Sequence, residues 1–439
     1  MLRKFFFVFF FASTLYSLSA QQELSLHFLR DTWQSSKTNP AFMTDFKVHY
    51  GLPNLYFNIT HTGPSYNELV VTSTNGENVL DVSAILNTLS ENNQLFTSFE
   101  VETTSVSFGI KNMRFSFNHA LKFNAFLDYP KDLVELAWNG NSQFIGETIK
   151  FGPDFQAFAY NEFGLGAAMK FLNVSAGLRL KILTGIGDVS TERTAASLYT
   201  DPDIYQLTFD TDYRLNSSSF LAYDGDGEFS LDFGEFSFDR ITSPNIGFAV
   251  DLGASIQLKK LEISASIIDL GGIKWNENIS NYTSQGSYTY DGLDISDIIN
   301  DDDVSFEETL DTLTDIFDFQ ESSESYSTML PTKIYLSGTY KVNDLFKVGG
   351  LFYSEVYRGT VFPAFAASAS VNLGKVFSVG AVYAIRNKTY DNVGLNATLK
   401  LGPVQIFAVT DNIVAAFQPY DSRNVNARIG LNMVFNKKK

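Results

Sequence analysis

The stretch NVNARIGLNMVFNKKK, which runs from Asn424 to Lys439, alternates between apolar residues and residues that are polar or glycine. A β-strand points successive side chains to opposite faces, so this stretch predicts a strand with one apolar and one wet face. Such a strand either packs on a soluble core or faces lipid on one side and enclosed water on the other. The apolar positions are Val425, Ala427, Ile429, Leu431, Met433 and Phe435, and the intervening ones, apart from Val434, are Asn424, Asn426, Arg428, Gly430, Asn432 and Asn436.

The same alternation recurs along the chain and predicts an all-β fold of 14 antiparallel strands. Every second connection is tight, and the others include the long segments 61–96, 129–153, 187–244 and 271–331. Short turns at one end and long loops at the other are typical of outer-membrane barrels, whereas a soluble sandwich or propeller, the alternative, has no reason to sort its loops by length. We therefore expect a 14-stranded antiparallel transmembrane β-barrel. The expected strands are 46–60, 97–110, 113–128, 154–171, 173–186, 245–258, 260–270, 332–342, 345–358, 362–373, 375–387, 392–401, 403–411 and 424–436. The expected tight turns are Lys111-Asn112, Leu172-Asn173, Lys259-Lys260, Asn343-Asp344, Gly374-Lys375 and Gly402-Pro403.

The chain divides into three parts. Residues 1–20 place basic residues before a short apolar run and predict a secretory signal, because that run is shorter than the ~20 residues that span a bilayer. Residues 21–45 lack the alternation and either plug the lumen or wrap the barrel rim. Residues 46–439 are expected to form the barrel, with both termini periplasmic and with extracellular insertions at 187–244 and 271–331. Short helices are expected in the loops at 81–91 and 130–138.

Composition excludes most catalytic chemistry. The chain has no Cys and four scattered His, with no His pair at helical spacing and no nucleophile elbow. We expect a protein that is not an enzyme and has no cofactor. Its expected surroundings are outer-membrane lipid and a surface or secretion-machinery protein, with no nucleic acid, and the barrel is expected to be monomeric.

Charge is unevenly distributed. The net charge of −17 comes from two loops, since 188–244 holds 12 acidic and three basic residues and 291–325 holds 13 acidic and no basic residues. The polar faces of the strands carry a basic ladder instead, with Asp251, Glu262 and Glu355 as candidate partners. The ladder either guides an anionic solute or forms ion pairs across a closed lumen. Its members are Arg114, Lys122, Arg179, Lys181, Lys333, Arg386, Lys400 and Arg428.

One residue does not fit the alternation. His119 has the lipid-facing parity in its strand, which requires a bulge or a position at the membrane interface.

The loop sequence DGDGEFSLDFGE has acidic residues at positions 1, 3, 5, 9 and 12, the spacing of an EF-hand calcium loop. Phe229 stands at position 6, where that loop requires glycine. The interpretations are a solvated acidic hairpin or a weak surface Ca²⁺ site. The candidate ligands are Asp224, Asp226, Glu228, Asp232 and Glu235.

Ser305 to Glu308 fit a capping box and predict a short loop helix with one apolar face. This helix either folds back over the barrel mouth or docks a partner. Its apolar face comprises Phe306, Leu310, Leu313 and Phe317.

Four short motifs carry a family resemblance. They are TNPAF (Thr38 to Phe42), YGLPNL (Tyr50 to Leu55), IIDLGGIKW (Ile267 to Trp275) and AVTDNI (Ala408 to Ile413). Together they resemble an uncharacterised Bacteroidota outer-membrane barrel family, distantly similar to FadL-type fatty-acid channels and to the PorV and PorP/SprF barrels of type IX secretion and gliding. This resemblance implies 14 strands and an N-terminal segment in the lumen.

Two functions follow as hypotheses. The first is a non-catalytic partner or scaffold in a surface assembly connected with secretion or gliding, which the large loops, the loop helix and the resemblance favour. The alternative is a passive FadL-like channel for hydrophobic or anionic small molecules, which the basic lumen favours.

Overall fold

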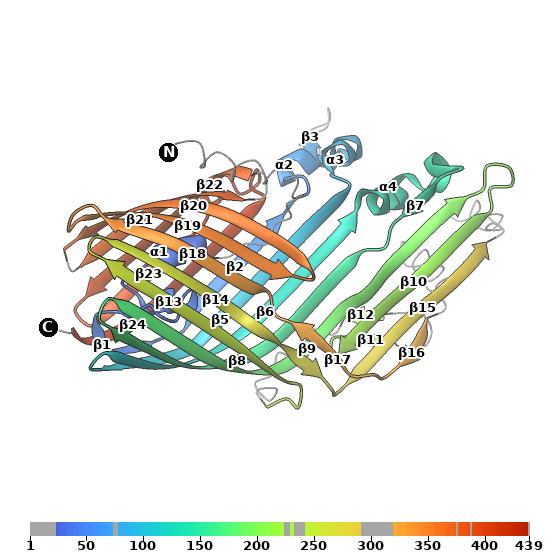
Figure 1. The fold of residues 1–439 in the computed structure, drawn as a ribbon. Helices are drawn as coiled ribbons and strands as arrows, with labels where there is room; N and C mark the ends of the chain where they lie inside the picture. Colours follow the sequence, from blue (N-terminus) through green and yellow to red (C-terminus); the bar gives the residue numbers. More distant parts are fainter. Residues whose placement is uncertain are drawn as a thin grey trace, which may run out of the picture.

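The computed structural model describes residues 23–72, 78–223, 229–231, 242–290, 319–374, 376–386 and 389–437. Its main sheet is antiparallel and closes on itself as a 14-stranded barrel, as predicted (Figure 1). β1 (Phe46–Gly51) and β2 (Asn54–His61) together form the first strand, and both pair with β24 (Asn424–Lys437) to close the barrel. Between them, in chain order, lie β5 (Asn92–Ile110), β6 (Met113–Pro130), β8 (Asp154–Phe171), β9 (Val174–Thr200), β13 (Ile246–Leu258), β14 (Leu261–Trp275), β18 (Thr332–Lys341), β19 (Phe346–Tyr357), β20 (Thr360–Leu373), β21 (Phe377–Arg386), β22 (Thr389–Leu401) and β23 (Val404–Thr410).

The alternation of β24 sorts its side chains as the sequence predicts. Ile429 is 57% exposed on the outside of the barrel, whereas Arg428 and Asn432 point inward and are at most 1% exposed. The same sorting recurs on the other strands, where exposed Leu165 and Phe365 alternate with buried inward-facing neighbours. The barrel therefore has an apolar outer surface and a filled interior.

Short turns mark one end of the barrel, called here the short-turn end. Lys111, Leu172 and Lys259 each have φ near +50°, the left-handed conformation that two-residue hairpin turns require. Phe46 pairs with Lys437 at the same end, so the barrel begins and finishes there. The opposite end, with the long connections, is called the long-loop end.

His119 lies on the outer face, as its parity predicts, and a bulge is present in the neighbouring strand β5. The pairing of β5 with β6 shifts register between Glu102 and Thr104, which leaves Thr103 without a direct opposite residue. The Oγ1 of Thr103 lies 2.7 Å from Nδ1 of His119, and the His119 ring packs against Phe163. The bulge thus supplies a polar neighbour for a ring that otherwise faces outward.

The long-loop end carries an outer sheet built partly from the two expected insertions, 187–244 and 271–331. β9 continues to Thr200, beyond the predicted end at residue 186, because its distal half pairs with β10 (Leu207–Ser218) instead of β13. Figure 1 shows β9, β10 and β15 extending past the rest of the barrel. The added strands are β7 (Thr148–Lys150), β15 (Ile279–Tyr290) and β16 (Gln320–Ser322). β17 (Tyr326–Met329) pairs with β14, and two small sheets join β3 (Val70–Thr72) to β4 (Asn78–Leu80) and β11 (Leu221–Tyr223) to β12 (Phe229–Leu231).

Helices are short, and none forms part of the barrel wall. α3 (Val82–Thr88) follows Asp81, whose side chain accepts a hydrogen bond from the amide of Ala84, and α4 (Lys131–Asn139) follows Pro130. Both agree with the predicted loop helices. The others are α1 (Leu24–Phe28), α2 (Tyr66–Leu69), η1 (Trp33–Lys37), η2 (Asn141–Phe144) and η5 (Val414–Ala416). In the described part of the chain, none of the helices is both long and apolar enough to cross a membrane.

Candidate functional site: a plugged lumen

The N-terminal segment, residues 23–45, lies inside the barrel, as the plug hypothesis predicts. Leu24 and Phe28 of α1 pack in one apolar cluster with wall residues that include Tyr353. Leu26 and Leu29 pack against Phe407 and Val409 of β23. The start of the segment is therefore held by apolar contacts to neighbouring strands of the wall, inside the barrel and not around its rim.

Asp411 holds the start of α1. Its carboxylate accepts hydrogen bonds from the backbone amides of Leu24 and Ser25, at 3.1 and 2.7 Å. The first amides of a helix have no partner within the helix, so a carboxylate at this position satisfies them and interacts favourably with the helix dipole. Asp411 belongs to the AVTDNI motif, which thereby acquires a structural explanation.

The TNPAF motif lies directly against the wall. A Cβ atom on Gly253 would come within 2.1 Å of the Asn39 side chain, and one on Gly177 would come within 2.3 Å of the Pro40 backbone. The Asn39 amide donates to the carbonyl oxygens of Ala254 and Ala265. Glycine is required where another part of the chain approaches the wall backbone this closely.

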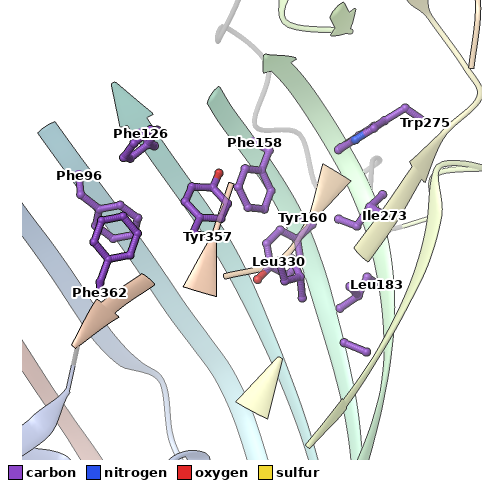
Figure 2. Close-up of a cluster of buried hydrophobic side chains, with 11 residues drawn as sticks. Phe96, Phe126, Phe158, Tyr160, Leu183, Ile273, Trp275, Leu330, Tyr357 and Phe362 are labelled. Carbon is purple, nitrogen blue, oxygen red and sulfur yellow. The ribbon is translucent and has the colours of Figure 1, made fainter. Parts of the chain in front are cut away.

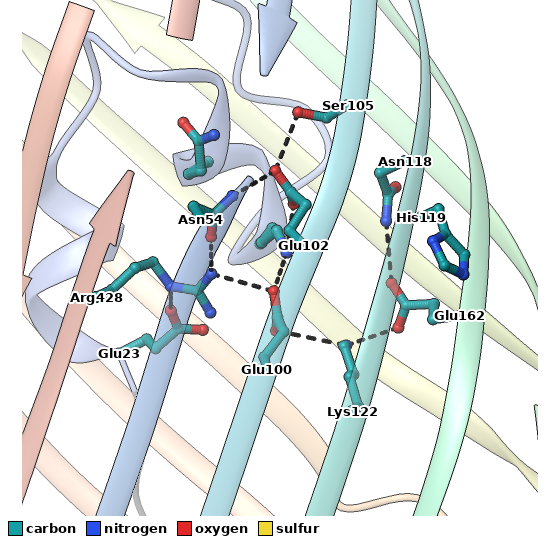
Figure 3. Close-up of polar contacts among 12 residues, drawn as sticks. Glu23, Asn54, Glu100, Glu102, Ser105, Asn118, His119, Lys122, Glu162 and Arg428 are labelled. Atoms are coloured by element: carbon teal, nitrogen blue, oxygen red, sulfur yellow. Dashed lines mark hydrogen bonds and ion pairs between the residues drawn. The ribbon is translucent and has the colours of Figure 1, made fainter. Parts of the chain in front are cut away.

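Ion pairs form the second kind of contact between segment and wall (Figure 3). Glu23 pairs with Arg428, and Arg428 Nη1 lies 3.1 Å from Glu100. Lys37 Nζ pairs with Glu100 and lies 2.6 Å from Glu102. Both acidic and basic side chains of the segment are thus matched by wall residues of opposite sign.

The same network continues around the wall. Lys122 pairs with Glu162 at 2.7 Å, and Lys181 Nζ lies 2.8 Å from Asp251. Lys333 pairs with Asp269 at 3.1 Å. We call this set the ionic network. Its acids are Glu23, Glu100, Glu102, Glu162, Asp251 and Asp269, and its bases are Lys37, Lys122, Arg179, Lys181, Lys333 and Arg428.

The predicted basic ladder lies on the inner face, and five of its eight members belong to the ionic network. Arg114 instead donates to the backbone carbonyls of Thr44 and Phe46, where the N-terminal segment enters the first strand. Lys400 Nζ lies 4.4 Å from the centre of the Phe46 ring. Arg386 is buried on the inner face of β21.

The three acids suggested as partners have different neighbours. Asp251 pairs with Arg179 and Lys181 of the ladder. Glu262 pairs with Arg30 of the N-terminal segment, and Glu355 accepts a hydrogen bond from the hydroxyl of Tyr353.

An aromatic layer crosses the lumen on the long-loop side of the ionic network (Figure 2). Phe96, Phe126 and Phe158 come from β5, β6 and β8, on the same inner face as Glu100, Lys122 and Glu162. Tyr357 packs edge-on against Phe126, with ring centres 5.6 Å apart. The layer comprises Phe96, Phe126, Phe158, Tyr160, Leu183, Ala249, Ile273, Trp275, Leu330, Tyr357 and Phe362.

Cavities lie above and below this filled region. An outer cavity of about 760 Å³ at the long-loop end is lined by residues of β8, β9, β10 and β17 and by Tyr357 and Arg358. An inner cavity of about 250 Å³ at the short-turn end is lined by Arg30, Lys347 and Lys400, among others. Within the ionic network the cavity measures only about 40 Å³. The lumen therefore narrows from both ends toward the N-terminal segment and the aromatic layer.

Sequence reasoning missed several residues of this site. Glu100, Glu162 and Asp269 carry the inner parity of their strands, which was the available signal. Lys37 lies in the segment without alternation, where no parity identifies a face. The aromatic layer was missed because inner positions were expected to be polar.

Two predicted sites lie outside the described residues. They are the calcium candidate Asp224, Asp226, Glu228, Asp232 and Glu235, and the helix face Phe306, Leu310, Leu313 and Phe317. Among the residues that the structure describes, no group of three or more His, Asp or Glu side chains is arranged to hold a metal ion.

Comparison with known proteins gives one family and several solved structures. Residues 40–411 match a family of unknown function (DUF5723). No curated protein matches the chain in sequence. The chain is similar to the Ralstonia pickettii toluene transporter TbuX, at 9% identity over 92% of this chain and 94% of that chain, with a TM-score of 0.43.

Two further structures are similar to the same extent. The P. putida toluene transporter TodX has 8% identity over 92% of this chain and 94% of that chain, with a TM-score of 0.41. A Pseudomonas aeruginosa FadL homologue has 9% identity over 93% of this chain and 95% of that chain, with a TM-score of 0.40.

Proposed function

Because the chain belongs to the DUF5723 family, whose function is unknown, we propose a function from the geometry of this chain itself. The protein is an outer-membrane barrel that passes a small molecule through its lumen. The N-terminal segment closes the lumen in this structure and moves when the solute passes.

The outer surface supports placement in a membrane. Large apolar side chains such as Leu180, Phe248 and Phe365 are exposed, at 52%, 66% and 61%. In water each such side chain lowers stability relative to burial by roughly 1.5–3 kcal/mol, whereas lipid removes that penalty. A closed barrel also satisfies the backbone hydrogen bonds of every strand, which lipid cannot do.

The ties between segment and wall support a closure that can move, and this observation carries the proposal. Two of these ties are buried ion pairs, Glu23 with Arg428 and Lys37 with Glu102. A buried ion pair contributes little net stability, because desolvation offsets the attraction. A segment held partly in this way leaves the lumen at a lower free-energy cost than one held by apolar packing alone.

The pairing of charges inside the barrel indicates which kind of solute the lumen favours. The ladder residues that would guide an anion, such as Lys181 and Arg428, already have carboxylate partners. The aromatic layer instead presents rings across the path. The alternatives expected from the sequence were an apolar and an anionic solute, and this arrangement favours a solute without net charge.

A reversible crosslink tests the proposal. Gln34 and Asn432 exchange two amide hydrogen bonds of 2.9 Å each between the segment and β24. The chain has no cysteine, so Gln34→Cys with Asn432→Cys, joined by a short thiol-specific reducible linker, introduces the only thiols. Solute flux is then measured in proteoliposomes for a panel of neutral, apolar and anionic molecules.

We expect the crosslinked protein to lose flux and to regain it after reduction. The matched control joins Arg193→Cys and Asp212→Cys, an ion pair on the outer sheet that lies away from the segment. Flux that is the same with and without the Gln34–Asn432 crosslink contradicts the proposal, as does the absence of flux for every solute in the native chain.

A scaffold in a surface assembly is the second candidate. The outer sheet that extends beyond the barrel favours it, since β9, β10 and β15 present a folded surface away from the bilayer. The link to secretion or gliding draws on the sequence resemblance alone. Purification from native membranes tests this candidate, because a scaffold retains a partner in fixed stoichiometry and a simple conduit does not.

A further inference from the structure

The outer cavity has an unusual lining for a protein whose path narrows onto aromatic rings. Every lining residue except Met329 has a polar or charged side chain. The volume of about 760 Å³ lies within the roughly 300–1,000 Å³ that small-molecule sites occupy. A hydrocarbon would displace water from these polar groups without offering them hydrogen bonds in return, which is costly.

The charges that line the cavity are already paired with each other. Arg358 forms an ion pair with Asp154 and also donates to the backbone carbonyl of Thr191. Arg214 pairs with Glu324 at 2.8 Å and with Glu192 at 3.3 Å. An ionic solute would have to displace a partner that the fold holds in place, so the cavity favours a neutral one.

Uncharged polar groups at the floor of the cavity are fixed by the wall. The Gln156 amide oxygen accepts from the Tyr357 hydroxyl at 2.5 Å, and its nitrogen donates to Asp188 and to Thr328. The Tyr326 hydroxyl donates to Asp188 at 2.9 Å. Groups held on strands in this way need little reordering to bind a solute, which reduces the entropic cost of binding.

Tyr357 joins the cavity to the aromatic layer. It lines the cavity, and its ring packs against Phe126 in the layer beneath. A solute at this position meets hydrogen-bonding groups around it and aromatic rings below it. Sugar rings suit both environments, because their hydroxyl groups point outward from the rim and their C–H groups form apolar faces.

We propose that the outer cavity is a binding site for a neutral saccharide of a few units. We place the uptake of the solute at this cavity, and this role rests on the proposed function. Binding of the saccharide to the cavity does not depend on whether the saccharide then passes through the lumen. Arg358 and Tyr326, which line the cavity and are partly exposed, are the groups that we expect to contact the hydroxyls.

Calorimetry on the purified full-length protein in detergent tests the site. The probes are neutral trisaccharides of glucose, mannose and N-acetylglucosamine, uronic-acid and amino-sugar analogues of the same size, and toluene. We expect one or more neutral trisaccharides to bind at least tenfold more tightly than their charged analogues. Binding of toluene or of a charged analogue without any neutral saccharide overturns the proposal, as does the absence of binding by the whole panel.

Two variants separate a specific site from nonspecific association. Arg358→Met removes a group in the cavity and should weaken saccharide binding at least tenfold. Arg193→Met is the matched control, since its ion pair with Asp212 lies on the outer sheet and Arg193 does not line the cavity. Equal affinity for both variants overturns the proposal. Because Arg358→Met can affect folding, Tyr326→Phe, which removes one hydroxyl, should also weaken binding with the melting temperature nearly unchanged.

The crosslinked Gln34–Asn432 variant distinguishes this inference from the proposed function. It should bind saccharide as the native chain does, because the cavity lies beyond the aromatic layer from the N-terminal segment. If saccharide binds but no form of the protein shows flux, the proposed function is contradicted and the saccharide site is not. If an apolar solute passes but no saccharide binds, the saccharide site is contradicted and the proposed function is not.

Discussion

Gly177 of β9 and Gly253 of β13 lie directly opposite each other in the barrel wall, and the Pro40 backbone and the Asn39 side chain occupy the space that their missing side chains leave. Two neighbouring strands thus lack side chains at one level, which lets an irregular segment lie against the wall. The contact explains why a motif without strand alternation precedes the barrel.

A methyl group at this contact should displace the segment. In Gly177→Ala the new Cβ would lie 2.3 Å from the Pro40 backbone, so the segment or the wall must shift. We expect a loss of about 1–3 kcal/mol, as for other overpacked positions, and faster proteolysis within residues 23–45.

Gly350 is the matched control, because it lies in β19 and a Cβ there would meet nothing within 4 Å. Gly350→Ala should leave proteolysis unchanged and leave stability equal or slightly higher. If residues 23–45 are equally resistant to proteolysis in both variants, the close approach at Gly177 is not what positions the segment.

Removal of the central cation should be costly. Arg428→Met leaves Glu23 and Glu100 in the lumen without this partner. Breaking a buried pair by removing one member costs about 3–5 kcal/mol, because the remaining charge is uncompensated. Chemical unfolding of the two proteins in detergent measures the difference.

Arg423→Met is the comparison for this prediction. Its pair with Glu68 is exposed at the long-loop end, where such pairs contribute about 0–1 kcal/mol. A similar loss in the free energy of unfolding for Arg428→Met and Arg423→Met would show that the lumenal network does not depend on Arg428.

The lipid-facing surface predicts a dependence on depth. Ile429 is exposed on the outer face of β24, whereas Leu172 is exposed in a hairpin turn at the short-turn end. Arginine on the lipid face costs about 2–4 kcal/mol near the bilayer midplane and about 0–1 kcal/mol near the interface. Ile429→Arg should therefore lower the free energy of unfolding in lipid vesicles more than Leu172→Arg does, and equal losses would contradict a membrane position of the barrel.

The tie between α2 and the connection before β24 should depend on pH. Burial by itself raises the pKa of Glu68, but hydrogen bonds from Arg423 and Ser65 and the charge of Arg423 outweigh it, so the pKa of Glu68 is lowered. The carboxylate therefore adds stability above its ordinary pKa of about 4.3, and this stability is lost as the pH falls through the lower folded-state value.

Hydrogen exchange of the α2 amides at several pH values measures this effect. Protection should decrease under acidic conditions in the native chain, and Glu68→Gln should show weaker protection without that pH dependence. A native profile that does not change with pH would mean that the ion pair does not hold the helix.

The sequence alone determined which side chains face outward and which face inward. Ile429 and Arg428 differ by one position, and that difference suffices because side-chain direction in a strand alternates strictly. The short turns could be predicted equally well from the sequence, since hairpin connections such as that at Lys111 depend on a few neighbouring residues.

Tertiary structure alone decided which inward residues meet and at what depth. Phe96 and Glu100 share one face of β5, and the alternation does not distinguish the aromatic layer from the ionic network. Lys37 meets Glu102 only because the closed barrel and the N-terminal segment bring distant parts of the chain together. The physical reason is that parity is a local property of the strand, whereas depth depends on the stagger between strands and on the path of a segment that has no parity.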